Sequence, residues 1–412
     1  MTNRITALIA DAQGNIFDVP QVEAVGRVGE KFFKLKPEDL IKLPDGADLM
    51  FLPQRRAIGL RRGEFVPLNG RAVSAILPQG YTRTHLPAFK RDSRAQILPL
   101  YGYTAVALYR DELYAAALYT DENHKWDPAN YNTRDLRKLI RRVKRDLPEN
   151  RIVEHVAHCS TQWHCLTAQN LFYRRWECGI PTSPTCNANC LGCISLQAAE
   201  CCPSPQSRIT FKPTADEIAA VGIYHLSHAA EGIISFGQGC EGEPSLQADN
   251  ICAAIKQIRA ETSRGQININ TNAGNTVGIK KIVDAGLNSM RVSIISARAD
   301  AYQKYYRAAY TLDAVKNSIR YALDNGVHVS LNMLYMPGFN DRDAEFAAWK
   351  NFLDALPVNM IQIRNLNYDP DAFFAAMGTD ENFCGTKKFL RDLQKNFPRI
   401  IVGNFSHFIG DK

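Results

Sequence analysis

Three cysteines lie close together near the middle of the chain, in residues 184–193. Cys186, Cys190 and Cys193 are spaced C-x3-C-x2-C. Three thiolates from one compact loop can ligate three irons of a 4Fe–4S cubane and leave the fourth iron open to another ligand. A zinc site is the alternative, but zinc loops usually combine one ligand pair with a second, distant pair. The spacing therefore favours an iron–sulfur cluster with one open iron.

A glycine-rich segment follows the strand-like run at residues 232–236. It contains Gly242, Glu243 and Pro244 in succession. Glycine allows a backbone to approach a ligand closely, and a carboxylate can accept hydrogen bonds from an amino group. A simple turn also uses glycine, but the position of the segment directly after a strand favours a ligand-binding role.

Polar side chains also interrupt apolar strands near their carboxyl ends, where barrel enzymes place ligand-binding groups. They are Asn270, Thr271 and Asn272 in one strand, Arg291 and Ser293 in the next, and Gln362 and Arg364 in a later one. Asn, Thr and Ser can instead cap strand ends without a further role. Gln362 and Arg364 share one face of their strand, and Arg364 would suit an anionic group. Strand alternation alone leaves open whether this face lies inside or outside the barrel.

Together the cysteine spacing and the Gly-Glu-Pro segment resemble the radical S-adenosylmethionine (SAM) superfamily over about residues 176–366. The resemblance implies that SAM chelates the open iron of a 4Fe–4S cluster through its amino and carboxylate groups. It also implies cofactor contacts from Gly242, Glu243, Pro244, Asn270, Thr271, Asn272, Arg291 and Ser293. The family usually has an aromatic residue before the last cysteine, where this chain has Gly192, so the adenine contact is expected from another residue.

The same resemblance implies an enzyme that cleaves SAM reductively to a 5'-deoxyadenosyl radical, which then acts on an unidentified substrate. An electron donor such as flavodoxin or ferredoxin would be required. Modification of RNA or of a peptide is an alternative within the family. A non-catalytic Fe–S electron-transfer protein is an alternative outside it, although an electron carrier needs no polar barrel mouth.

Five further cysteines surround the cluster loop, namely Cys159, Cys165, Cys178, Cys201 and Cys202. Their spacings match no common ferredoxin run, so a second Fe–S cluster and buried free thiols both remain open. Cys240 and Cys384 stand alone in the sequence and are candidates for thiol chemistry or are ordinary thiols.

The elements that must position these residues follow a βα alternation. Apolar strand-like runs separated by helical patterns lie at 176–184, 232–236, 266–270, 289–294, 327–336 and 358–366. Thr214 and Glu217 form a capping box for one of these helices, and Thr311 can cap another. These features predict an α/β fold, a partial (β/α)6 barrel of the TIM type, over residues 176–370.

Residues 1–150 show no βα alternation; their pattern instead predicts alternating strands followed by one basic amphipathic helix at 133–146. We expect an N-terminal α+β accessory domain here, with a hairpin at Arg110-Asp111-Glu112. Residues 151–175 are predicted to be a linker, and residues 371–412 a C-terminal extension.

With 412 residues, of which 45% are hydrophobic, the chain can bury a full core. No apolar run approaches the roughly 20 residues needed to span a bilayer, so a cytoplasmic protein without membrane contact is expected. The net charge of +7 is modest for this length, and a basic helix face is most often simply solvated. Binding to nucleic acid is therefore the less favoured expectation.

Overall fold

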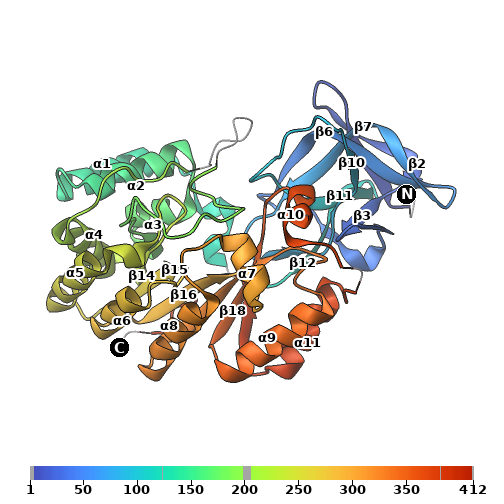
Figure 1. Cartoon of the computed structure of the whole chain (residues 1–412). Helices are drawn as coiled ribbons and strands as arrows, with labels where there is room; N and C mark the ends of the chain where they lie inside the picture. The colour runs from blue at the N-terminus through green and yellow to red at the C-terminus, as the bar shows by residue number, and fades with distance from the viewer. Residues whose placement is uncertain (1–3, 123, 198–205, 381, 411–412) are drawn as a thin grey trace.

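The computed structural model describes residues 4–122, 124–197, 206–380 and 382–410. The chain forms a β-rich N-terminal part and a larger α/β part that lie side by side (Figure 1). The N-terminus belongs to the β-rich part, and the C-terminus lies beside the α/β part.

A seven-stranded parallel sheet forms the centre of the α/β part, with its strands in sequence order. The strands are β13 (Arg175–Gly179), β14 (Ala230–Phe236), β15 (Gln266–Thr271), β16 (Ser289–Ile294), β17 (His328–Tyr335), β18 (Met360–Asn365) and β19 (Ile401–Gly403). The predicted partial (β/α)6 barrel is confirmed, and the short strand β19 extends it by one strand. Apolar residues such as Ile267, Ile269 and Val292 are fully buried.

Helices cover the outer face of this sheet (Figure 1). They are α4 (Ala215–His228), α5 (Ala248–Glu261), α6 (Thr276–Asp284), α7 (Ala299–Tyr306), α8 (Leu312–Asp324), α9 (Asp343–Ala355) and α11 (Thr386–Asn396). Helix α10 (Pro370–Met377) instead lies next to the β-rich part, where Arg27 pairs with Asp371. The predicted capping box is present, because the Thr214 hydroxyl accepts from Glu217 N and the Glu217 carboxylate accepts from Thr214 N. Thr311 caps α8 through its side chain alone, which accepts a hydrogen bond from Ala314 N.

The N-terminal part contains two antiparallel sheets. Their strands are β1 (Thr6–Ala10), β2 (Ile16–Glu23), β3 (Val25–Val28), β4 (Lys31–Lys34), β5 (Leu40–Lys42), β6 (Asp48–Arg61), β7 (Glu64–Ile76), β8 (Tyr81–Arg83), β9 (Leu86–Pro87), β10 (Phe89–Arg91), β11 (Thr104–Tyr109) and β12 (Glu112–Tyr119). The predicted hairpin is confirmed, since β11 and β12 pair through Arg110 and Asp111. Both turn residues have positive φ, as a type I′ turn requires.

Three helices follow the β-rich part: α1 (Leu136–Asp146), α2 (Arg151–Gln162) and α3 (Leu166–Tyr173). The predicted linker at 151–175 therefore contains two helices. Helix α2 forms because Asn150 caps its first turn and because Ile152, Val153 and Val156 bury one face in the main hydrophobic core. Lys144, on the basic helix α1, pairs with Glu154 of α2.

The two parts are joined by buried polar contacts. Arg55 of β6 forms an ion pair with Asp369, which precedes α10, and both side chains are fully buried. Arg83 of β8 donates to the Leu366 carbonyl, and Asn365 Nδ2 donates to Tyr81 O over 2.8 Å. The β-rich part is thus fixed against the end of β18. No helix within the described residues is long and apolar enough to cross a membrane.

Candidate active site

A cavity of about 530 Å³ lies at the carboxyl ends of the barrel strands. Its wall contains the cysteine loop, the segments that follow β13, β14 and β15, and inner-face residues of β16, β17 and β18. Residues from α2, α3 and the C-terminal segment complete the wall, among them Phe405, which stacks on Trp126. The cavity therefore occupies the position where barrel enzymes bind their ligands.

The three cysteines predicted to ligate a cluster, Cys186, Cys190 and Cys193, all line this cavity and are partly buried. Asn272 Nδ2 lies 4.0 Å from Cys186 Sγ, and Arg208 Nη2 lies 3.7 Å from Cys193 Sγ. Burial raises the pKa of the Cys186 and Cys190 thiols, so cluster binding would have to release their protons. Three thiols on one loop beside a cavity fit a 4Fe–4S cluster whose open iron faces that cavity.

Backbone hydrogen bonds hold the cysteine loop in place. Asn189 N donates to Tyr306 O over 2.9 Å, and Leu191 N donates to Tyr305 O over 3.0 Å. These two carbonyls lie in the last turn of α7, where carbonyl groups have no partner within the helix. The last helix carbonyls thus find hydrogen-bond donors in the loop, and the loop amides find acceptors at the helix end.

A Cβ at Gly192 would lie 2.9 Å from the Tyr305 hydroxyl and 3.0 Å from a methyl carbon of Leu366. In this chain the space next to the last cysteine is therefore filled by Tyr305 and Leu366. An aromatic side chain at position 192, as the family commonly has, would not fit without moving them.

The glycine-rich segment after β14 packs directly on the cysteine loop. Gly242 N donates to Ser183 O over 2.7 Å, and Glu243 N donates to Thr185 O over 2.8 Å. A Cβ at Gly242 would lie only 2.0 Å from Thr185 O, so this position requires glycine. The close approach expected of this glycine is made to the backbone of the cysteine loop.

Glu243 is buried and joins the β14 segment to the end of β15. Its carboxylate accepts from Ser245 N over 3.0 Å, from the Thr271 hydroxyl, and from Asn272 N over 2.8 Å. Burial raises the pKa of Glu243, while these donors oppose the shift. Glu243, Thr271 and Asn272 all line the cavity. Pro244, also buried, begins the short helix η4 (Pro244–Gln247).

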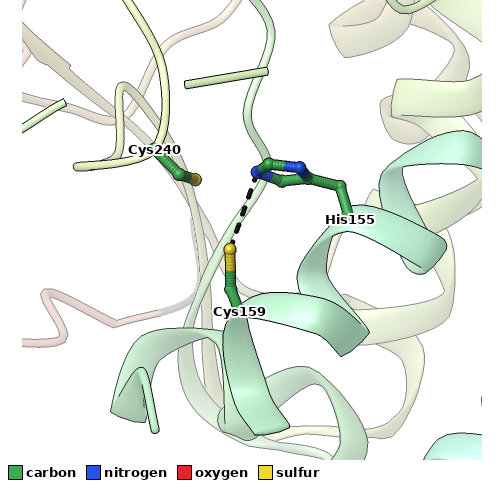
Figure 2. Close-up of side chains that lie close together, drawn as sticks. All are labelled: His155, Cys159 and Cys240. Atoms are coloured by element: carbon green, nitrogen blue, oxygen red, sulfur yellow. Dashed lines mark hydrogen bonds between the residues drawn. The ribbon is translucent and has the colours of Figure 1, made fainter. Parts of the chain in front are cut away.

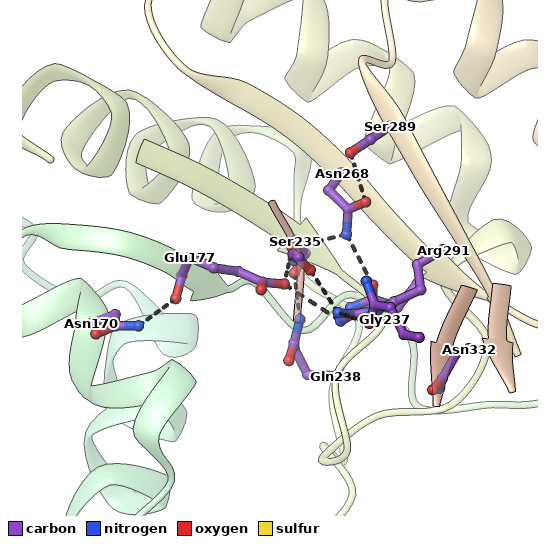
Figure 3. Close-up of polar contacts among 12 residues, drawn as sticks. Asn170, Glu177, Ser235, Gly237, Gln238, Asn268, Ser289, Arg291 and Asn332 are labelled. Atoms are coloured by element: carbon purple, nitrogen blue, oxygen red, sulfur yellow. Dashed lines mark hydrogen bonds and ion pairs between the residues drawn. The ribbon is translucent and has the colours of Figure 1, made fainter. Parts of the chain in front are cut away.

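A polar network fills the inner face of the barrel beneath the cavity (Figure 3). Arg291 lies 3.5 Å from the Glu177 carboxylate and donates to Gln362 Oε1 over 3.2 Å. Ser235 Oγ donates to the same Glu177 oxygen over 2.6 Å. The charge of Arg291 is therefore already balanced within the barrel, although its side chain also reaches the cavity wall.

The remaining strand residues differ in their access to the cavity. Asn270, Ser293 and Arg364 line it, whereas Gln362 is buried beneath it against Arg291. The polar face of β18 thus points into the barrel. Arg364 donates to Asn404 O over 2.8 Å, and burial lowers its pKa to about 10, which leaves the guanidinium charged at neutral pH.

Glu241 is a buried residue that the sequence reasoning passed over. Its carboxylate accepts five hydrogen bonds, from Thr182 N and Oγ1, Ser183 N, Gly237 N and Gln238 N. Burial raises the pKa of Glu241 to about 7 despite these donors. It ties the exit of β13 to the exit of β14, and its only sequence signal is an acidic residue within a glycine-rich turn.

The cysteines proposed for a second cluster are not all brought together. Cys159 and Cys165 line the cavity, whereas Cys178 lies in the hydrophobic core, on the face of β13 opposite Glu177 and Gly179. Cys201 and Cys202 lie outside the described residues. Cys384 is partly buried and is not among the cavity-lining residues.

Residues 180–349 match the family model of the radical SAM superfamily. An uncharacterized protein of Methanocaldococcus jannaschii, MJ0804, is 26% identical over 230 residues, which cover 54% of this chain and 71% of that protein.

Two solved structures are more distant. Methylornithine synthase (PylB) has 15% identity and a TM-score of 0.40, over 65% of this chain and 74% of its own. Coproporphyrinogen III oxidase (HemN) from Escherichia coli has 13% identity and a TM-score of 0.34, over 54% and 51%. The family match covers the cysteine loop and strands β14 to β17, which build most of the cavity. By this match, the part of the chain that holds the cysteine loop and most of the cavity, residues 180–349, is similar to the radical SAM superfamily.

Proposed function

We propose that this enzyme binds SAM at a 4Fe–4S cluster held by Cys186, Cys190 and Cys193 and cleaves it reductively to act on a further substrate. The observation that carries the proposal is that all three thiols line one cavity together with the strand-end residues implied by the family resemblance. A reduced cluster with an open iron supplies the one-electron cleavage of SAM into methionine and a 5'-deoxyadenosyl radical.

The protein would contribute position and charge to this chemistry. Glu243 presents a carboxylate at the cavity wall, fixed by donors from Thr271 and Asn272, where the SAM amino group would need an acceptor. Asn270 offers an amide and Ser293 a hydroxyl on the adjoining strand ends, and both groups suit the polar parts of the nucleoside. Arg291, which also reaches the cavity wall, would donate a hydrogen bond to the SAM carboxylate, while Glu177 balances its charge and holds its guanidinium in place.

Arg364 is the residue that we assign to the substrate. Its guanidinium is charged, lines the cavity and has no carboxylate partner among the ion pairs of the described residues. A buried cation of this kind favours a substrate that carries a carboxylate or phosphate group. Gln362 would act indirectly, by positioning Arg291.

The test is anaerobic reconstitution with iron and sulfide, followed by iron counting and a chromatographic assay for 5'-deoxyadenosine after addition of SAM and dithionite. The Cys186→Ala, Cys190→Ala, Cys193→Ala triple variant should lose both the cluster and the product. Cys252→Ala is a matched control, because this partly buried thiol on α5 does not line the cavity. A fully loaded wild type that never forms 5'-deoxyadenosine would refute the proposal and favour an electron-transfer role.

A further inference from the structure

A second group of side chains that could ligate a metal lies apart from the cluster loop, and two of its three members, Cys159 and Cys240, line the cavity. His155 and Cys159 occupy positions i and i+4 of α2 and so share one face of that helix. Cys240 reaches the same point from the segment after β14 (Figure 2). The His155 Nε2, Cys159 Sγ and Cys240 Sγ atoms all lie within 4.8 Å of one another.

The spacing of these atoms suits one ion. Cys159 Sγ lies 3.6 Å from His155 Nε2. With Zn–S and Zn–N bonds of about 2.3 and 2.0 Å, a tetrahedral zinc ion separates two such ligand atoms by roughly 3.6 Å. In a 4Fe–4S cubane each thiolate binds a different iron, so the ligand atoms lie farther apart. The observed group is therefore compact enough for a single ion and too compact for a cubane.

The three side chains are held by structure that does not depend on a metal. Cys159 and Cys240 are buried, and both line the cavity. The imidazole of His155 packs edge-on against Phe211, at 6.5 Å between ring centres. Cys240 O accepts from Ile209 N over 2.8 Å, and Cys159 O accepts from Cys165 N over 3.1 Å. A preformed set of two thiols and one imidazole is a donor set that Zn²⁺ prefers.

We propose that His155, Cys159 and Cys240 bind one zinc ion, whose fourth coordination position faces the cavity. Cys165 also lines the cavity, but it is not part of the compact group. Among the described residues no fourth ligand joins the group, and we infer that the fourth position is open to water or to a donor atom of the substrate, as in catalytic zinc sites with three protein ligands. This site is distinct from the Cys186, Cys190 and Cys193 loop and does not rest on SAM cleavage.

The first test is the zinc and iron content of the full chain purified anaerobically, combined with X-ray absorption at the zinc edge. We expect about one zinc per chain, bound by two sulfur atoms and one imidazole nitrogen of the protein. The Cys186→Ala, Cys190→Ala, Cys193→Ala triple variant should keep this zinc while it loses its iron, which separates the proposal from the SAM-cleaving function. The absorption measurement needs no variant and so remains decisive if a variant fails to fold.

Substitutions then identify the ligands. His155→Ala and Cys159→Ser should each lose the zinc, whereas Cys165→Ser, the matched control on the same wall, should retain it. Absence of zinc from the wild type would overturn the proposal, as would a Cys159–Cys240 disulfide detected by mass spectrometry. Iron and sulfide remaining in the triple variant would point instead to a second cluster. Loss of zinc from Cys165→Ser would overturn the open fourth position.

Discussion

The replacement of Gly242 by alanine tests whether the contact between the β14 segment and the cysteine loop sets the geometry of the site. The added Cβ would lie 2.0 Å from Thr185 O and 2.4 Å from Thr185 C, where ordinary contacts begin at 3.4 Å. The two segments must therefore separate by more than about 1 Å. This movement would break the Gly242 N to Ser183 O hydrogen bond and the neighbouring one to Thr185 O.

A displacement of about 1 Å at a reacting centre can cost about 100-fold in rate. We expect Gly242→Ala to slow 5'-deoxyadenosine formation by about this factor, measured by liquid chromatography under anaerobic, SAM-saturated conditions. Iron content, measured on the same samples, tells a displaced cluster from a lost one. Gly326→Ala is the control for a general loss of stability: Gly326, unlike Gly242, has positive φ, so alanine strains the backbone there, but its Cβ would meet no atom within 4 Å and the residue lies outside the cavity. A wild-type rate in Gly242→Ala at full iron content would refute the reasoning.

Two further predictions concern stability. Burial lowers the pKa of His225 to about 4, and its Nε2 lies 2.7 Å from Trp176 O. Below about pH 6.5 the imidazole of His225 takes up a proton in the unfolded chain but not in the folded one. The free energy of unfolding should therefore fall by up to about 3 kcal/mol between pH 6.5 and pH 4. The melting temperature of His225→Gln should fall less over that range, and parallel pH profiles would contradict this. Asp369→Ala should lower the free energy of unfolding, measured in urea, by about 3–5 kcal/mol, because it leaves the Arg55 cation buried without its partner. The control is Glu112→Ala, which breaks an exposed ion pair with Lys42 and should have little effect. Equal effects of the two substitutions would contradict it.

The barrel could be predicted from the sequence because its strands are apolar runs of five or more residues bounded by caps such as Thr214 and glycines such as Gly286. Strand β19 has only three residues, too few for a pattern to emerge. Helices α2 and α3 were missed because polar and cysteine residues interrupt their apolar stripes. The order of the N-terminal strands could not be derived, since pairings such as β1 with β11 join residues about a hundred positions apart.

The site residues likewise fall into those that a local sequence pattern predicts and those that only the folded structure brings together. The cysteine loop and the Gly-Glu-Pro segment are local patterns, so spacing alone identified them, although their ligand roles remain predictions. Glu241 and His155 depend on neighbours that only folding brings close, namely Thr182 for the first and Cys240 for the second. The i, i+4 spacing of His155 and Cys159 was the one signal in the sequence that could have indicated their shared face.

The hydrogen bonds that fix the cysteine loop have a thermodynamic consequence. Because the Tyr305 and Tyr306 carbonyls and the Glu243 amide already hold the loop backbone, its ordering entropy is lost when the chain folds and not when iron arrives. Cluster assembly would then proceed on a preorganised receptor and need little refolding. Oxygen damage that strips the iron would leave the empty loop in a shape ready for repair, so repeated loss and rebuilding of the cluster should spare the rest of the enzyme.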